Sequence, residues 1–293
     1  MSTTNVLGVG SLSALVLVAA ASCGGSLETS LERLSEAQRL SSDLLVQFSK
    51  SNDAGNRAVM AEADDATAAF VREAESAAQT VQQQADALGA TLGALGYSAE
   101  SGLLDEFRTR FATYRALDQT ILDLAVEHTN LKAQRLSFGP AQQAVEAFDT
   151  ALDGVTAAAG NDAWQARALA ATALAAVREV QVLQAPHIAE AEDAAMDRLE
   201  ARMRAAESEA RAALGTLGGV LPPDARRPFT EAEAALNRFM TVQTELITLS
   251  RRNSDVRSLA LSLGQRRQMA AACEETLRAL QGTLVNRSLG GSR

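Results

Sequence analysis

The chain has 293 residues, a net charge of −9 and few aromatic side chains. Its Ala, Glu, Leu, Arg and Gln favour helix over sheet, and a negative chain without a basic stripe argues against nucleic acid as a partner. We find no Gly-rich phosphate loop, nucleophile elbow, Cys cluster or metal-type His spacing. The sequence therefore predicts no enzyme, no cofactor, and no catalytic or metal-binding residues.

The chain opens with an apolar segment, VLGVGSLSALVLVAAASC, which runs from Val6 to Cys23 without a charge. About 18 residues are just long enough to cross a bilayer core, so we assign residues 1–25 to an uncleaved membrane anchor. A lipoprotein signal is the alternative, because Ala20–Cys23 resembles a lipobox and would make Cys23 a lipidation site. A cleaved signal peptide is the third interpretation. No Lys or Arg precedes the apolar run, which weakens both signal interpretations.

An internal repeat follows, in which residues 121–152 align without gaps on residues 246–277. A second match, MAEADDA at 60–66 over IAEAEDA at 188–194, lies upstream in the same order. We interpret the two halves as a duplicated unit. The identical pairs of the longer match are Leu124/Leu249, Leu136/Leu261, Ser137/Ser262, Gly139/Gly264, Gln143/Gln268, Ala147/Ala272 and Leu152/Leu277.

Apolar residues at helical spacing predict four long arms separated by clusters of Gly and Pro. The arms run from about 27 to 88, 103 to 153, 163 to 214 and 229 to 285. The predicted fold is all-α: an elongated antiparallel four-helix bundle from a duplicated long helical hairpin, divisible into two stacked modules. The bundle occupies residues 26–287, with hairpins at about 27–157 and about 162–287, and residues 288–293 form a disordered tail.

Two polar residues interrupt the apolar seams of the second and fourth arms. The seams, Phe107–Leu131 and Ala232–Val256, keep close to a 3.5-residue period, which indicates helices packed nearly parallel. His128 and Asn253 occupy similar places on these seams. Counting residues outward from each turn places His128 beside the first acidic motif, MAEADDA, and Asn253 beside the second, IAEAEDA.

Gly139 and Pro140 lie inside the second arm, where they weaken or break an ordinary helix. Gly139 has a counterpart in Gly264, whereas Pro140 has none. The same counting places Gly139 beside residue 52 and Gly264 beside residue 178. We therefore expect a kinked but continuous helix at Gly139–Pro140, which marks a waist between a membrane-distal module and a shorter membrane-proximal one.

The polar residues near the seams form a candidate ligand site between the helices, where bundle sites are usually built. Its members are His128, Asn130, Lys132, His187, Asn253 and Arg257, with Glu62, Asp65, Glu190 and Asp193 of the acidic motifs expected in the same layer. A layer of His and carboxylates could also respond to pH. The structural alternative is that His128 and Asn253 only fix the helix register, as single polar core residues do in coiled coils.

Two further residues are given a structural interpretation. Cys273 aligns with Phe148 in the repeat and is predicted to be a small core residue. Arg266, beside Gly264, could bind an anion, but a solvated basic pair with Arg267 is the interpretation that we adopt.

Three stretches carry a resemblance to a known family: HTNLKAQRLSFGPAQQA, VREVQVLQAPHIAEAEDAAM and NSDVRSLALSLGQRRQM. They resemble parts of the extracytoplasmic sensor regions of bacterial methyl-accepting chemotaxis proteins, of the four-helix-bundle or helical bimodular type. The resemblance covers most of residues 27–285 and implies a dimeric receptor sensor in which ligand binding moves a helix slightly. The chain departs from the family after Val285, where neither a second span nor a cytoplasmic signalling hairpin follows.

The expected function is that of an extracytoplasmic ligand-sensing bundle of a chemoreceptor-like signal transduction protein without its own cytoplasmic signalling domain. The expected location is the bacterial inner membrane, with the bundle in the periplasm. The expected partners are a second copy of the chain, the membrane, and a small-molecule ligand or a partner protein. The alternative is a stand-alone helical spacer or adaptor, held by a membrane anchor or as a lipoprotein.

Overall fold

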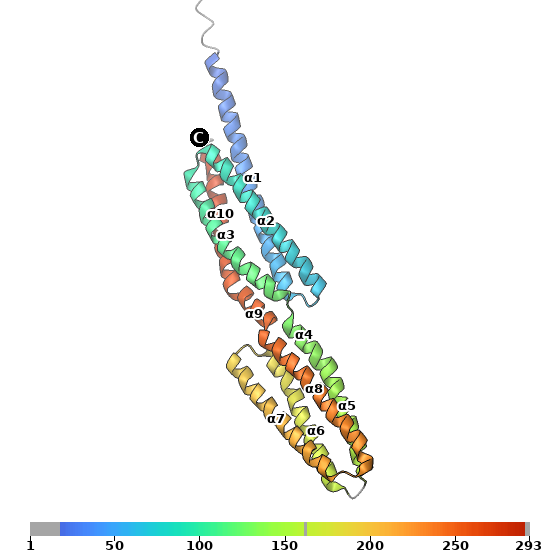
Figure 1. The fold of residues 1–293 in the computed structure, drawn as a ribbon. Coiled ribbons are helices and arrows are strands. Elements are labelled where there is room, and N and C mark those ends of the chain that lie inside the picture. Colours follow the sequence, from blue (N-terminus) through green and yellow to red (C-terminus); the bar gives the residue numbers. More distant parts are fainter. Residues whose placement is uncertain (1–17, 161–162, 291–293) are drawn as a thin grey trace, which may run out of the picture. The chain divides into compact units, whose positions relative to one another are not determined.

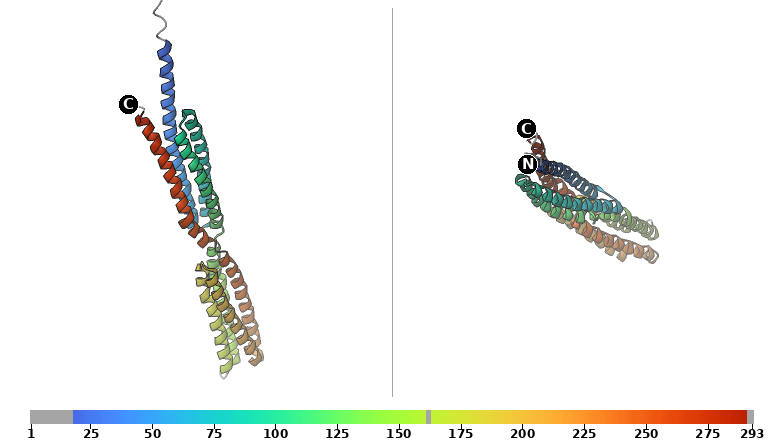
Figure 2. Two further views of the ribbon diagram at one scale, coloured as in Figure 1. Left: turned by 90° about the vertical axis from the view of Figure 1, so that its left-hand side faces the viewer. Right: turned by 90° about the horizontal axis from the view of Figure 1, so that it is seen from above.

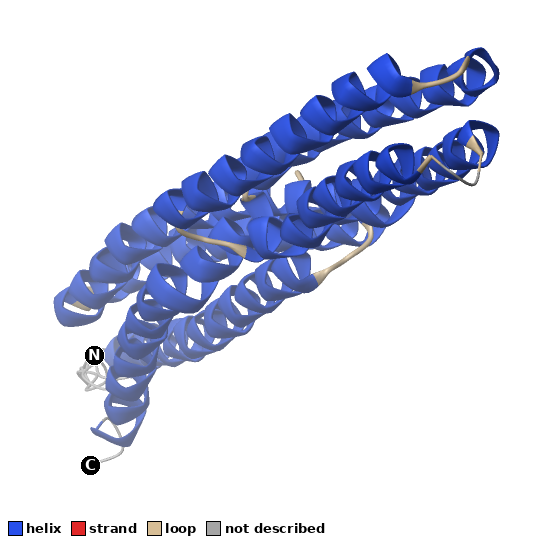
Figure 3. Cartoon of the chain, turned by 90° about the horizontal axis from the view of Figure 1, so that it is seen from below, coloured by secondary structure: helices blue, strands red, loops and turns tan. Residues whose placement is uncertain are grey.

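The computed structural model describes residues 18–160 and 163–290, with side chains for residues 28–160 and 163–289. Within these ranges every regular element is a helix and none is a strand, as the composition predicts (Figures 1 and 3). The chain divides into two compact units. Unit 1 takes the residues up to Ala54, Arg72–Ala116 and the residues from Arg267, and unit 2 takes Gly55–Val71 and Leu117–Arg266.

Unit 1 is built from four helices that lie side by side (Figure 1). They are α1 (Val18–Met60), α2 (Asp64–Leu95), α3 (Ser98–Ala125) and α10 (Arg267–Gly290); the end of α1, the start of α2 and the end of α3 belong to unit 2. Side-chain amides tie α10 to α1: Gln38 Nε2 donates to Leu284 O at 3.0 Å and Gln281 Nε2 to Ser41 O at 3.1 Å. Unit 1 therefore joins helices from the two ends of the chain.

The core of unit 1 is aromatic and aliphatic. The ring of Phe48 lies edge-on to Phe107, Phe111 and Tyr114, with centroid distances of 6.2, 6.0 and 5.2 Å. Cys273 is buried in the same core, which confirms its predicted structural place. Aromatic pairs in this geometry are stabilising beyond the area that they bury.

Unit 2 holds the remaining helices (Figure 2). They are α4 (Thr129–Leu136), the π-helix η1 (Ser137–Ala141), α5 (Gln142–Ala159), α6 (Trp164–Ala189), α7 (Asp193–Val220), the 3-10 helix η2 (Pro223–Ala225), α8 (Arg226–Arg252), α9 (Ser254–Leu261) and the π-helix η3 (Ser262–Arg266). Its core is rich in buried Ala, with Phe148, Val177, Leu214 and Phe239 as larger members. Small side chains let these helices approach closely, and a Cβ on Gly218 would lie 2.9 Å from the Phe229 ring.

The two acidic motifs are turns rather than parts of long arms. α1 ends at Met60 and α2 begins at Asp64, while α6 ends at Ala189 and α7 begins at Asp193. The prediction of one long arm at 27–88 and another at 163–214 is therefore wrong, because each is a pair of helices that folds back on itself. The Asp residues lie in the first turn of the new helices, where negative charge is favourable.

The chain stays helical through Gly139 and Pro140, as predicted, in the form of the π-helix η1. The predicted waist is wrong at Gly139 and Pro140, which lie within unit 2, but residue 52 and Gly264 of the same prediction lie within three residues of the unit boundaries at Ala54 and Arg266. The neighbours also differ from those expected. Ser137 Oγ of η1 donates to Gln184 Oε1 at 2.7 Å, and Ser262 Oγ of η3 donates to Asn56 Oδ1 at 3.3 Å. Counting from the turns fails here because the arms fold back at the acidic motifs.

No helix among residues 18–160 and 163–290 is long and apolar enough to cross a membrane. Most of the predicted anchor at residues 1–25 lies outside the described residues, as does the side chain of Cys23. At the other end, α10 continues to Gly290. Residues 288–290 of the predicted tail are therefore helical, and residues 291–293 lie outside the described part.

Candidate functional site

Two helix breaks in unit 2 organise the candidate site. His128 separates α3 from α4 with φ 48° and ψ 40°, and Asn253 separates α8 from α9 with φ 53° and ψ 39°. Within the described ranges these are the only residues other than Gly with positive φ. His and Asn tolerate this left-handed conformation better than most residues, but it is sparsely populated and persists where surrounding contacts determine it.

The contacts that hold the breaks run from one break to the other. A helix that begins after a break leaves its first N–H groups without intrahelical partners. Thr129 N donates to Ser254 Oγ at 3.1 Å, and Ser254 N donates to Thr129 Oγ1 at 2.9 Å. One residue further on, Asn130 N donates to Asp255 Oδ2 at 2.8 Å and Asp255 N donates to Asn130 Oδ1 at 3.2 Å. Each helix start is thus capped by side chains of the other.

An ion pair flanks these caps. Arg252 Nε donates to Glu127 Oε2 at 2.6 Å, and the hydrogen bond from the guanidinium lowers the pKa of the Glu127 carboxyl below its usual value. In every one of these pairs the partners are 125 residues apart. We call the two segments 127–130 and 252–255 the crossed-cap joint.

The His128 ring is buried and has a polar partner at each nitrogen. Nε2 lies 2.8 Å from Thr67 Oγ1 of α2, and Nδ1 lies 3.3 Å from Asp255 Oδ1 of α9. Asp64 Oδ1 is 3.8 Å from Nε2. The predicted proximity of His128 to the first acidic motif is confirmed, but the contact is made by Thr67, one residue beyond the motif.

The Asn253 side chain sits against the second acidic turn. Its Nδ2 donates to Glu190 O at 2.9 Å, and its Oδ1 accepts from Asn130 Nδ2 at 2.8 Å. Asn130 Nδ2 also donates to Ile188 O at 2.8 Å. The carbonyls at the end of α6 are therefore satisfied by the joint, and the predicted place of Asn253 beside this motif is confirmed.

His187 belongs to a neighbouring buried network. Its Nδ1 lies 2.8 Å from Ser250 Oγ, and its Nε2 lies 3.0 Å from Glu200 Oε1. Arg251 Nε donates to the same carboxylate at 2.5 Å. Burial opposes ionisation of Glu200, but the hydrogen bonds from Arg251 and His187 outweigh it, so the pKa of Glu200 lies below its usual value.

Two predicted site residues stand apart from these networks. Lys132 is exposed and its Nζ donates to Glu127 O at 2.8 Å, and Arg257 is exposed on α9. The second acidic motif contributes the backbone carbonyls of Ile188 and Glu190, whereas Glu62, Asp65 and Asp193 are exposed. The predicted layer is therefore wrong in these charged members, which face solvent instead of a buried layer, and Asp193 Oδ1 lies 3.8 Å from NH1 of Arg251.

The sequence interpretation also missed a buried ion pair. Arg266 of η3 is 1% exposed, and its NH1 lies 2.9 Å from Asp118 Oδ1 of α3, which is also buried. A second nitrogen contacts Asn56 Oδ1. A Cβ on Gly55 would lie 2.6 Å from Arg266 NH1 and 3.2 Å from Asp118 Oδ1, so a larger residue there would displace the ion pair from this arrangement. The prediction that Arg266 and Arg267 form a solvated basic pair is wrong for Arg266. Nothing in the sequence after Gly264 indicates that one of these two Arg side chains is buried.

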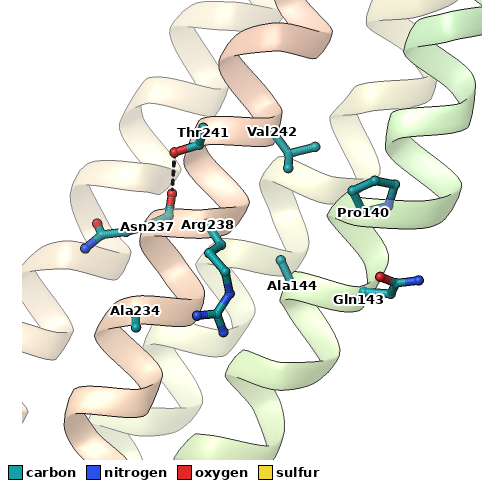
Figure 4. Close-up of a pocket in the computed structure, with 8 residues that line it drawn as sticks. All are labelled: Pro140, Gln143, Ala144, Ala234, Asn237, Arg238, Thr241 and Val242. Atoms are coloured by element: carbon teal, nitrogen blue, oxygen red, sulfur yellow. Dashed lines mark hydrogen bonds between the residues drawn. The ribbon is translucent and has the colours of Figure 1, made fainter.

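Cavities and grooves open on the described part of unit 2. One, of about 280 Å³, lies beside the crossed-cap joint. A second, of about 320 Å³, lies between α7 and α8. The third is a groove of about 540 Å³ between α5 and α8, lined by Pro140 of η1, by Ala144 of α5 and by Arg238 of α8 among others (Figure 4). Only the first is lined by members of the joint.

Comparison of the chain with protein-family models, with curated proteins and with solved structures finds no significant match.

Proposed function

We propose that the chain is a ligand-sensing helical bundle of a chemoreceptor-like signal transduction protein, located in the periplasm and held at the bacterial inner membrane by its N-terminal apolar segment. The duplicated helical hairpin and the homodimer belong to the same proposal. The resemblance of three stretches to chemotaxis sensor regions supports it. So does the local geometry, since the caps of the joint pair residues that the repeat aligns.

One observation carries the proposal: a buried polar joint in a helical unit adjoins a cavity. The left-handed residues His128 and Asn253 are held by hydrogen bonds rather than by covalent constraint. A ligand shifts an equilibrium only through different affinity for two states. A cavity lined by Asn130 and Asp255 lets a ligand contact the residues that cap α4 and α9.

The test is a thermal-shift screen of the protein with amino acids, organic acids, nitrate and amines. A ligand that binds only the folded form raises its melting temperature. We expect a saturable shift for at least one class, reduced by Thr129→Val, which disturbs the joint, and kept by Thr150→Val, which changes an exposed Thr of α5. A flat response to every class would instead support the spacer or adaptor function.

The membrane location has a separate test. Mass spectrometry of the mature N-terminus distinguishes an intact Met1, which supports the anchor, from a chain that begins at a lipidated Cys23. A chain cleaved without lipid and found free of membranes would contradict both forms of attachment.

A further inference from the structure

The two halves of the crossed-cap joint differ in one hydrogen-bond donor. Asn130 uses its side-chain NH₂ to bridge Ile188 O and Asn253 Oδ1, each at 2.8 Å. Its counterpart across the joint, Asp255, has a carboxylate in place of the amide and so lacks the NH₂ donor. Met60 aligns with Ile188 in the acidic motifs, so its backbone carbonyl receives no corresponding amide hydrogen bond from Asp255. The Asn130 half of the joint thus holds a donor where the Asp255 half presents oxygen atoms.

The cavity of about 280 Å³ is lined from both halves of the joint, by Asn130 and Ile188 as well as by Asp255 and Met60, and its lining is acidic and apolar. Its charged members are Asp255, whose side chain is 25% exposed, and Glu62. Among the described residues that line it, none is Lys, Arg or His. Its apolar members are Val59, Met60, Ala61, Leu131, Ile188, Ala189, Val256 and Leu259.

The Asp255 carboxylate keeps room for another donor. Its Oδ2 accepts from Asn130 N and its Oδ1 lies 3.3 Å from His128 Nδ1, and each carboxylate oxygen offers about two acceptor positions. An ammonium group supplies three N–H donors and a positive charge. An anion at the same place would face two carboxylates.

We propose that this cavity binds a small aliphatic ammonium ion, with the charged nitrogen on Asp255 and the alkyl chain on the apolar wall; this rests on the proposed sensing function. The ligand takes the place that the Asn130 amide fills in the other half of the joint. A volume near the lower end of ligand pockets suits an amine of about four carbons.

The test is isothermal titration of the protein with n-butylammonium chloride, 1-butanol and sodium butyrate. The three titrations are carried out in the same buffer at about pH 7.5, where an aliphatic amine is an ammonium ion and butyrate is a carboxylate. We expect saturable binding of n-butylammonium and none of butyrate. From n-propylammonium to n-pentylammonium, the dissociation constant should fall roughly three- to fourfold for each added methylene.

Two variants of equal charge locate the site. Asp255→Asn should weaken n-butylammonium binding by about tenfold or more, as expected for loss of a hydrogen bond to a charged group. Asp153→Asn, at an exposed position of α5, should leave the dissociation constant unchanged. Leu259→Trp, which fills the cavity without changing the joint, should abolish binding in a protein with a near wild-type melting temperature.

Equal binding of n-butylammonium to the wild type and the Asp255→Asn and Leu259→Trp variants would overturn the amine site, as would preferential binding of butyrate. If amines fail while another class stabilises the protein in a joint-dependent way, the amine site is wrong and the sensing function stands. If no class binds, both fail.

Discussion

The interiors of the two units are built on different principles. Unit 1 centres on Phe48 and the rings that surround it, and its buried side chains are mostly apolar. Unit 2 carries a small-residue core together with buried His, Asn, Ser, Thr and Gln. Buried polar groups are costly unless they have hydrogen-bond partners. The interior of unit 2 therefore requires specific pairs of polar side chains, whereas the interior of unit 1 mainly requires apolar side chains that fill its volume.

Removal of the central ring of unit 1 should have the largest effect. Phe48→Ala deletes a fully buried side chain from the aromatic cluster, which should lower the free energy of unfolding by about 4 kcal/mol. Chemical denaturation measures the loss. The exposed Phe138→Ala is the control and should change little. If Phe48→Ala weakened ligand binding to unit 2 as strongly as it lowers the free energy of unfolding, the contrast between a structural unit 1 and a binding unit 2 would be wrong.

Breaking the buried ion pair of unit 2 should come next. Asp118→Asn leaves the Arg266 guanidinium buried without its counter-charge, which should cost about 3 kcal/mol of stability. The double variant Asp118→Leu with Arg266→Met removes both charges and should recover much of that loss. Denaturation of both variants gives the comparison, and a double variant as unstable as Asp118→Asn would show that the pair itself stabilises unit 2.

Disrupting the crossed caps should have an intermediate effect. Thr129→Val removes the hydroxyl that accepts from Ser254 N, and loss of a helix cap typically costs about 1 kcal/mol. Ser254→Ala should cost a similar amount. Because Thr129 Oγ1 also donates to Ser254 Oγ at 3.1 Å, both single variants remove this one hydrogen bond. The double variant should therefore lose less than the sum of the single losses, and strict additivity in a double-mutant cycle would contradict the bond between the two hydroxyls.

The flanking ion pair should have the smallest effect and a defined pH dependence. The pKa of Glu127 is lower in the folded protein than usual because of the Arg252 hydrogen bond. Its stabilisation is thus present above the ordinary Glu pKa of about 4.3 and is lost as pH falls through the lower folded value. Glu127→Gln should remove this pH-dependent stabilisation, which amounts to less than about 1 kcal/mol of the free energy of unfolding for so exposed a pair. Denaturation curves from about pH 3 to pH 7 measure it, with Glu245→Gln, an exposed residue of α8, as the control.

The helical class and the core seams were predictable, because composition and periodicity report them directly. Phe107, Phe111 and Ile121 of the predicted seam are buried, as are Leu236, Phe239 and Leu246 of its counterpart. The places of His128 and Asn253 beside the acidic motifs were also predictable from counting. The sequence therefore located the centre of the joint before its geometry was known.

The turns at the acidic motifs escaped prediction because Ala and Glu are strong helix formers and neither motif contains Gly or Pro. The available signal was Asp64 and Asp193, since acidic residues mark the first turn of a helix. The joint itself depends on pairs 125 residues apart in the chain. Local propensity carries no information on which side chain caps which distant helix, so Thr129, Ser254 and Arg266 could not be assigned.

The π-helix η1 lets buried positions recur every four residues without leaving the core. Ala133, Ser137, Ala141 and Val145 are all buried at this spacing. In an uninterrupted α-helix each four-residue step turns the buried face by about 40°, so three steps would carry Val145 about 120° away from Ala133. Ser258, Ser262, Arg266 and Ala270 repeat the spacing through η3. Each π-helix thus acts as a one-residue insertion in the helical segment that contains it. Deletion of one residue in η1 should turn Val145 and Phe148 of α5 away from their core.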